Sequence, residues 1–251
     1  MGGYAYCRMG RSLLLALGHE LILPLESDLG PWITEAKLHE IERDPSWMAD
    51  ELARCPEEPW YWATNYIYTI RKDEFTKDAK PEVLRFPALE HLRYVFHQCF
   101  TQPYLVIDKS RQMTLSWALM LYLLHIAQFG SHEEIIIQTK KEVDADALVK
   151  RAEFMAKGQR KWMRPEFSSA FCRLRFPQTS CSMRGLPGGV GAGDQIRSAN
   201  PSRYFLDEGG FVDEFEECRT AALACCRDVK IVSTANHGEF QIFVEDKMEQ
   251  L

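Results

Sequence analysis

The stretch YLVIDKSRQMTLSWALMLYLLHIAQF, residues 104–129, decides the expected fold. Residues 104–107 form an apolar run typical of a buried strand, and residues 117–129 are apolar almost all round, which predicts a buried helix. The polar residues 108–116 connect the two. Such a turn from a strand into a helix can hold a phosphate chain, because backbone N–H groups and the helix dipole point at the anion. An ordinary turn with a few polar residues is the alternative.

Short apolar runs alternate with helical stretches over the rest of the chain. Further strands are expected at residues 134–138, 171–176, 203–206 and 229–233. Residues 143–157 are expected to form an amphipathic helix. Strands that alternate with helices indicate an α/β fold, in which helices flank a mostly parallel sheet. Residues 31–100 are typical of helices and loops, so the fold is expected to have a helical N-terminal segment.

The composition excludes several classes of protein. Of the 251 residues, 46% are hydrophobic and 26% are charged, as in an ordinary globular protein. The longest nearly uncharged stretch, residues 117–130, is shorter than the ~20 residues of a membrane-spanning helix. A net charge of −6 gives no overall basic field, although a local basic stripe can still contact DNA. Eight cysteines without a CxxC pair argue against a zinc site and fit a reducing cytoplasm.

Two later strands also end in residues that suit phosphate chemistry. The segment RYFLDE, residues 203–208, is an apolar run followed by two acids, the pattern of a Walker B motif. In that role Asp207 would hold Mg²⁺ and Glu208 would activate the attacking water. The strand that ends in KIVS leads to Thr234 and Asn236, which could contact the γ-phosphate or the catalytic water.

The loop after the first strand departs from the Walker A consensus GxxxxGK[ST]. Thr114 and Leu115 stand where glycine and lysine would be, while Ser116 keeps the hydroxyl position. Lys109, at the beginning of the loop, is the only lysine within reach. The consensus alone would reject a nucleotide site, but the acidic pair after the later strand favours one.

Together these segments resemble the ATPase domain of phage large terminases, the motors that package DNA into procapsids. The segments that carry the resemblance are KSRQM with Ser116, FLDE at residues 205–208 and STAN at residues 233–236. The family often has a deviant Walker A in which the lysine begins the loop, as Lys109 does here, and it often has glycine at the place of Thr114. Weaker similarities lie at residues 59–70, 135–151 and 194–197. The resemblance implies a P-loop NTPase-type sheet.

The resemblance also implies a binding role for single residues. Lys109 would neutralise the β- and γ-phosphates of ATP. Ser116 and Asp207 would hold Mg²⁺. The residues expected to bind the nucleotide are Lys109, Ser110, Arg111, Gln112, Met113, Thr114, Leu115, Ser116, Thr234 and Asn236.

Catalytic and coupling roles follow from the same resemblance. Glu208 would be the catalytic carboxylate, and Arg111 would sense the nucleotide. Thr234 and Asn236 would form the coupling motif that links hydrolysis to movement. Arg197 matches the position from which some members insert an arginine finger into the neighbouring subunit, with an ordinary surface arginine as the alternative.

The implied activity is Mg²⁺-dependent ATP hydrolysis that drives double-stranded DNA into a procapsid in the host cytoplasm. The implied partners are double-stranded DNA, the portal protein of the procapsid, a small terminase subunit and further copies of the chain in a homo-oligomeric ring; no membrane is involved. Residues 1–56 are expected to be an N-terminal arm or helical lead-in, and residues 57–251 the P-loop ATPase domain without a nuclease domain. Two alternatives stay open, another helicase-like P-loop motor and a degenerate module that binds nucleotide or assembles without turnover.

Two further stretches have both a functional and an ordinary interpretation. Residues 185–193, GLPGGVGAG, are interpreted as a mobile loop that lets Arg197 move, or as a plain linker, and are not expected to run from a strand into a helix. Residues 150–164 are the most basic part of the chain. They could track DNA through phosphate contacts, or form a solvated helix face.

Overall fold

The computed structural model describes residues 5–9, 33–71, 81–109, 114–234, 236 and 238–249, and at residues 5–9, 71 and 247–249 it describes the backbone alone. The strands of its main sheet are β1 (Ala5–Met9), β4 (Tyr104–Lys109), β5 (Glu134–Thr139), β6 (Ser168–Ala170), β7 (Arg173–Phe176), β8 (Cys181–Pro187), β9 (Arg203–Asp207) and β10 (Asp228–Thr234). A separate antiparallel pair consists of β2 (Tyr68–Arg71) and β3 (Glu82–Arg85). The helices are α1 (Glu35–Ile41), α2 (Pro45–Glu57), α3 (Pro59–Tyr66), α4 (Glu90–Thr101), α5 (Leu115–Phe129), α6 (Glu142–Gly158), α7 (Ala192–Ala199), α8 (Phe215–Cys225) and α9 (Glu239–Glu249).

The main sheet is mostly parallel. Its strands lie in the order β1-β4-β10-β9-β5-β8-β7-β6. Every neighbouring pair from β1 to β8 is parallel, whereas β7 and β6 extend the sheet as an antiparallel edge. Parallel neighbours need crossover connections, which the helices supply. The predicted α/β fold, a mostly parallel sheet flanked by helices, is confirmed.

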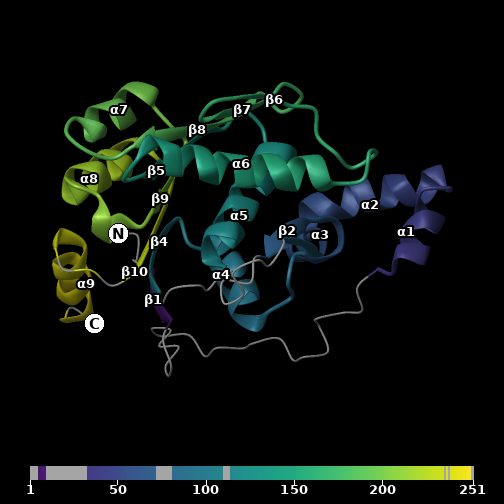
Figure 1. The fold of residues 1–251 in the computed structure, drawn as a ribbon, viewed down its shortest axis with the longest axis horizontal. Coiled ribbons are helices and arrows are strands. Elements are labelled where there is room, and N and C mark those ends of the chain that lie inside the picture. The colour runs from purple at the N-terminus through teal and green to yellow at the C-terminus, as the bar shows by residue number, and fades with distance from the viewer. Residues whose placement is uncertain are drawn as a thin grey trace.

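Helices cover both faces of this sheet (Figure 1). Successive strand residues point to opposite faces, so Leu105 and Ile107 pack in the core with α4, α5 and α6, while Tyr104 and Val106 pack with α7, α8 and α9. The apolar helix predicted after the loop is α5, which is buried on most of its surface. Among the helices in the described part of the chain, none has both the length and the apolarity needed to cross a membrane.

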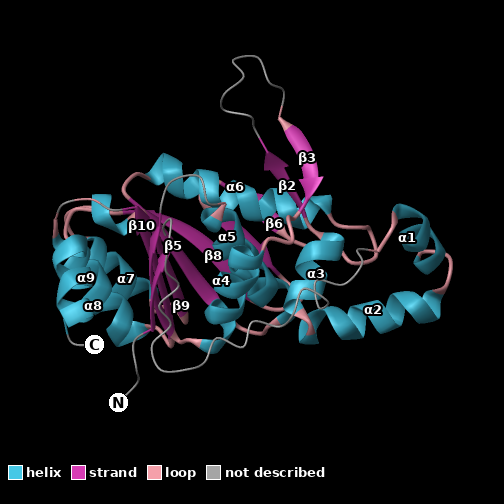
Figure 2. Ribbon diagram, turned by 90° about the horizontal axis from the view of Figure 1, so that it is seen from below, coloured by secondary structure: helices cyan, strands magenta, loops and turns pink. Residues whose placement is uncertain are grey.

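Aromatic residues join the N-terminal helices to α5. In Figure 2 the helices α1 and α2 extend away from the main sheet, and α3 lies between them and the rest of the molecule. Trp62 of α3 is fully buried and meets His125 and Phe129 of α5 at ring distances of 5.2 and 5.6 Å. The aromatic stretch of α3 is therefore core, and it anchors the helical N-terminal segment that the sequence predicted.

Two parts of the sheet differ from the expectation. Ala5–Met9, within the expected N-terminal arm, form β1 and pair in parallel with β4. The domain boundary at residue 57 stays a prediction. The strand predicted over residues 171–176 was too long, because β6 and β7 form a hairpin and Cys172 lies in its turn with a φ of 54°.

The glycine-rich stretch also differs from the expectation, because it connects β8 to α7 and so does run from a strand into a helix. Two acids line it. Glu214 accepts a hydrogen bond from the backbone N–H of Gly191 over 3.2 Å, and a Cβ on Gly193 would lie 2.7 Å from a carboxylate oxygen of Glu217. Since these carboxylates would repel an anion, the loop is unsuited to holding phosphate. Its mobility stays a prediction.

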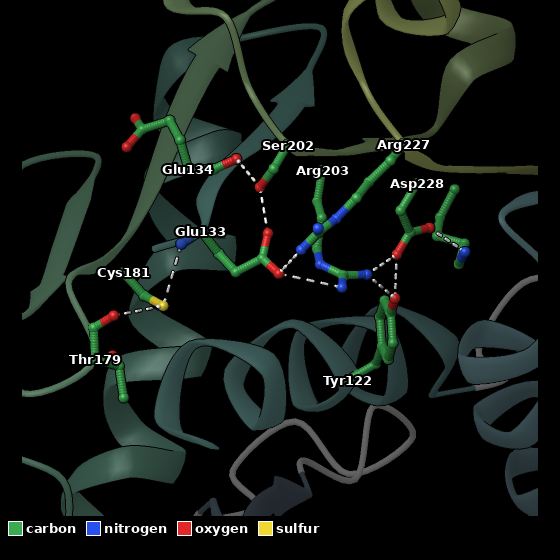
Figure 3. Close-up of polar contacts among 10 residues, drawn as sticks. Tyr122, Glu133, Glu134, Thr179, Cys181, Ser202, Arg203, Arg227 and Asp228 are labelled. Atoms are coloured by element: carbon green, nitrogen blue, oxygen red, sulfur yellow. Dashed lines mark hydrogen bonds and ion pairs between the residues drawn. The ribbon is translucent and has the colours of Figure 1, made fainter. Parts of the chain in front are cut away.

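A buried network of charges holds the opposite edge of the sheet, where β9 and β10 begin (Figure 3). Asp228 accepts hydrogen bonds from Tyr122, Arg203 and Lys230. Lys230 is only 1% exposed, and it also donates to the carbonyl oxygen of Gln102 over 2.6 Å. The network connects the start of β10 to β9, α5 and the end of α4. A second carboxylate, that of Glu133, pairs with Arg203 and Arg227.

Candidate functional site

The carboxyl ends of three neighbouring parallel strands meet at one edge of the sheet. β10 lies between β4 and β9. In the register of these strands, Thr234 is opposite Lys109 and Val232 is opposite Asp207. The polar residues that follow each apolar run therefore come together, at the edge where open α/β sheets bind ligands.

The connection from β4 into α5 makes a tight turn at Thr114. This residue directly precedes α5 and has a left-handed backbone, with φ 60° and ψ 8°. Its carbonyl oxygen accepts hydrogen bonds from the N–H groups of Trp117 and Ala118 at 3.1 and 3.2 Å. Glycine takes this backbone conformation readily, whereas a β-branched residue is strained in it. The predicted loop residues Ser110, Arg111, Gln112 and Met113 lie outside the described residues.

Ser116 and Asp207 form the part of the site that fits magnesium. The Ser116 hydroxyl, from the first turn of α5, donates a hydrogen bond to Oδ2 of Asp207 over 2.7 Å. Magnesium binds oxygens at about 2.1 Å, so adjacent ligands of an octahedral shell lie about 3 Å apart, close to this separation. Burial raises the pKa of Asp207, although the Ser116 hydroxyl and the charge of Lys109 oppose the rise.

Within the described residues there is no group of three or more His, Cys, Asp or Glu side chains that could hold a metal. A magnesium ion on Ser116 and Asp207 would therefore complete its shell with water and phosphate oxygens. Such a shell is usual for magnesium at phosphate-transfer sites, where one or two protein oxygens suffice.

Lys109 and Glu208 form an ion pair between the ends of β4 and β9. Nζ of Lys109 donates to Oε1 of Glu208 over 2.9 Å, and the lysine side chain is 8% exposed. Oε2 of Glu208 accepts from the N–H and the hydroxyl of Thr234 at 3.1 and 3.0 Å. Burial raises the pKa of Glu208, but the bonds from Lys109 and Thr234 outweigh it, so the pKa is lowered. An ionised carboxylate is thus held between an ammonium group and the end of β10.

The segment after Glu208 is also tied to the end of β10. The N–H of Gly210 donates to the hydroxyl of Ser233 over 2.9 Å, and the side-chain amide of Asn236 donates to the carbonyl oxygen of Gly210 over 2.6 Å. A Cβ on Gly210 would lie 2.9 Å from the Ser233 hydroxyl, so no larger residue fits without a shift. A movement of the Glu208 backbone would therefore be passed to residues 233–236.

Two of the predicted site residues lie apart from this cluster or turn away from it. Leu115 is buried in the core, so only its backbone can face a ligand. Arg197 lies on α7, with its side chain 45% exposed, and pairs with Asp194 at 2.7 Å and with Glu217 at 3.6 Å. Neither of these partners belongs to the cluster around Lys109 and Glu208. The finger role of Arg197 stays a prediction.

The basic stretch at residues 150–164 is largely neutralised by acids of the same chain. Lys150 pairs with Asp146, and Lys157 with Glu153. Arg160 pairs with acids of the N-terminal helices, Glu35 and Glu42. The stretch is therefore a poorer candidate for tracking DNA than its sequence suggests.

Arg151 is the functional candidate that the sequence analysis did not single out. It is half-buried rather than on a solvated face, and it lies close enough to Asp207 for their charges to affect each other's pKa. The signal was its spacing: position 151 lies three residues after Leu148 and four before Met155, both of which are buried. A cation on the apolar face of a helix faces the core.

Comparisons with known proteins find similarity at the level of structure. No protein-family model matches the sequence, and no curated protein matches it. The large terminase of bacteriophage HK97 matches 78% of this chain with a TM-score of 0.54 and 14% identity, and the match spans 41% of that protein. The ATPase domain of Thermus phage P74-26 large terminase (TM-score 0.42, 17% identity, 54% of this chain, 61% of that chain) and the ADP complex of the large terminase from a thermophilic bacteriophage (TM-score 0.45, 14% identity, 58% and 37%) also match. Over most of its described length, the chain shares the fold of the HK97 large terminase.

Proposed function

We propose that this chain is the ATP-hydrolysing motor domain of a phage large terminase and drives double-stranded DNA into a procapsid. The observation that carries the proposal is the cluster at the carboxyl ends of β4, β9 and β10. There Lys109, Glu208 and Thr234 are joined by hydrogen bonds beside the Ser116–Asp207 pair, at the first turn of α5. The fold shared with the HK97 large terminase supports the same proposal.

The described residues divide the chemistry among them. Lys109 binds the β- and γ-phosphates; its ammonium has three donors, so it can contact phosphate while keeping the bond to Glu208. Ser116 and Asp207 hold Mg²⁺, which supplies charge neutralisation when bound. Glu208 orients the attacking water, since its carboxylate is ionised and fixed by Thr234.

The loop from Ser110 to Met113 wraps the phosphates in this proposal, with Arg111 sensing the nucleotide. Thr234 and Asn236 couple hydrolysis to movement. Support for coupling comes from the bond between Asn236 and Gly210, which ties the end of β10 to the backbone just after Glu208.

The chain acts in a homo-oligomeric ring in this proposal, at the procapsid portal in the host cytoplasm, with the portal protein and a small terminase subunit as partners. Arg197 completes the site of the neighbouring copy. Its exposure supports this role, because a finger must be reachable from outside its own subunit. To reach a phosphate it must exchange its present carboxylate partners, Asp194 and Glu217.

The test is the replacement Glu208→Gln. We expect ATP hydrolysis to fall by about 100-fold or more, the scale of losing a positioned catalytic base, with nucleotide binding retained. Glu214→Gln is the matched control, because Glu214 also has a left-handed backbone, with a φ of 60°, but bonds to the glycine-rich loop instead. Turnover that is unchanged in Glu208→Gln would remove Glu208 from the mechanism.

One observation favours a second candidate, a module that binds nucleotide without turnover. The strained backbone of Thr114 at the loop's entry to α5 is not the conformation that a threonine prefers, so the loop need not close around the phosphates as a glycine would allow. Tight ATP binding without phosphate release, in the presence of linear DNA, would support this candidate over the motor.

A further inference from the structure

Arg151 is fixed beside the turn that begins α5. It lies in the middle of α6, and its guanidinium carbon is 5.5 Å from the centroid of the Trp117 ring. That ring also meets Phe154 of the same helix edge-to-face at 6.1 Å. Trp117 directly follows Ser116, whose hydroxyl is bonded to Asp207. A cation on an aromatic face is attracted by the ring, so Trp117 holds the planar guanidinium next to the magnesium-fitting pair.

The donors of Arg151 are not used elsewhere in the described part of the chain, where no hydrogen bond or ion pair engages its guanidinium. The neighbouring basic residues differ, since Lys150 is paired with Asp146 and Lys157 with Glu153. Burial lowers the pKa of Arg151 and the charge of Asp207 opposes that effect. Arginine stays protonated in proteins, and a half-buried guanidinium is costly unless its donors find acceptors. A bound anion would supply them.

We propose that Arg151 contacts the phosphate chain of the bound nucleotide, as a second cation together with Lys109. This assignment rests on the proposed function. Lys109 already balances the charge of Glu208, so the site needs a further cation for the negative charge of a triphosphate. A guanidinium can bind two phosphate oxygens at once through parallel hydrogen bonds, which a lysine cannot do.

The experiment compares the wild type with Arg151→Gln and Arg151→Met. The methionine variant keeps an apolar chain against Trp117 and removes only the charge, so it remains informative if the glutamine variant does not fold. Lys150→Gln is the matched control, because Lys150 is adjacent on α6 and its side chain is 67% exposed. Two ligands are titrated against a fluorescent ATP analogue: ATP with Mg²⁺, and inorganic tripolyphosphate, which has no base or ribose. Thermal unfolding without ligand is recorded for every variant.

We expect both Arg151 variants to weaken binding of ATP and of tripolyphosphate by about 10- to 100-fold, the range of one charge-assisted contact, and Lys150→Gln to leave both unchanged. A merely structural role would lower the unfolding temperature without this loss for tripolyphosphate. If the wild type binds nucleotide and a folded Arg151 variant binds both ligands within twofold of it, the assignment is wrong and the proposed function stands. If the wild type binds neither ligand, both are wrong.

Discussion

Replacing Asp228 with asparagine removes the negative charge at the centre of the buried network where β9 and β10 begin. Asparagine has nearly the same shape, so the change tests charge rather than packing. Asp228 is bonded to Tyr122, Arg203 and Lys230 in the wild type. After the replacement Arg203 keeps Glu133, whereas Lys230 keeps only the neutral carbonyl of Gln102.

The magnitude follows from the burial of Lys230, whose side chain is 1% exposed. Removing one partner of a buried ion pair leaves an uncompensated charge and costs about 3–5 kcal/mol. For a chain of this size, each kcal/mol lowers the unfolding temperature by about 2–4 °C, so a fall of roughly 6–20 °C is expected. Urea unfolding followed by tryptophan fluorescence measures the free energy of unfolding directly.

Two further variants make the result decisive. In Asp228→Asn with Lys230→Met both charges are gone, so at least about 2 kcal/mol of the loss should be recovered. Glu40→Gln is the control, since Glu40 is 57% exposed and its pair with Lys37 should contribute less than about 1 kcal/mol. The reasoning is refuted if Asp228→Asn loses less than about 1 kcal/mol, or if the double variant recovers nothing.

Two other predictions concern strain and pH. Thr114→Gly should raise the free energy of unfolding by up to about 1 kcal/mol, because glycine relieves the left-handed backbone and the threonine side chain makes no capping bond that would be lost; a lower free energy in urea unfolding would contradict this. Burial lowers the pKa of His125 to about 4, although its bond to the Cys55 carbonyl opposes the shift. Because the unfolded chain binds that proton near pH 6.5, stability is fully present above that pH and falls as the pH drops toward 4, by about 2 kcal/mol between pH 7 and pH 5. Urea unfolding of the wild type and His125→Gln at both pH values checks this, and an equal loss in the two proteins would exclude His125 as the source.

The sequence predicted the parts of the fold that depend on local pattern. The apolar runs at residues 104–107, 203–206 and 229–233 are strands, and the polar residues after them lie together because parallel strands end at one edge of the sheet. β1 was missed, since the five residues AYCRM show neither alternation nor a long apolar run. Its place depends on pairing with β4, nearly a hundred positions later.

Arg151 and Asp228 show why the remaining features were not predicted. Whether a charged residue is buried depends on which helix face meets which neighbour, and the stretch around Arg151 looks like a solvated basic face. Asp228 and Lys230 are two positions apart, but their burial depends on Tyr122 and Gln102, which lie far away in the sequence. Such long-range contacts leave little trace in the local pattern.

The central claim is that Lys109, at the beginning of a deviant loop, serves a working nucleotide site. The most direct test measures ATP binding and Mg²⁺-dependent hydrolysis by the wild type and Lys109→Ala, at high protein concentration and with linear duplex DNA. The account predicts binding and turnover by the wild type and loss of turnover in the variant. A wild type that binds no ATP would contradict the claim, and so would a Lys109→Ala variant that hydrolyses ATP as fast as the wild type.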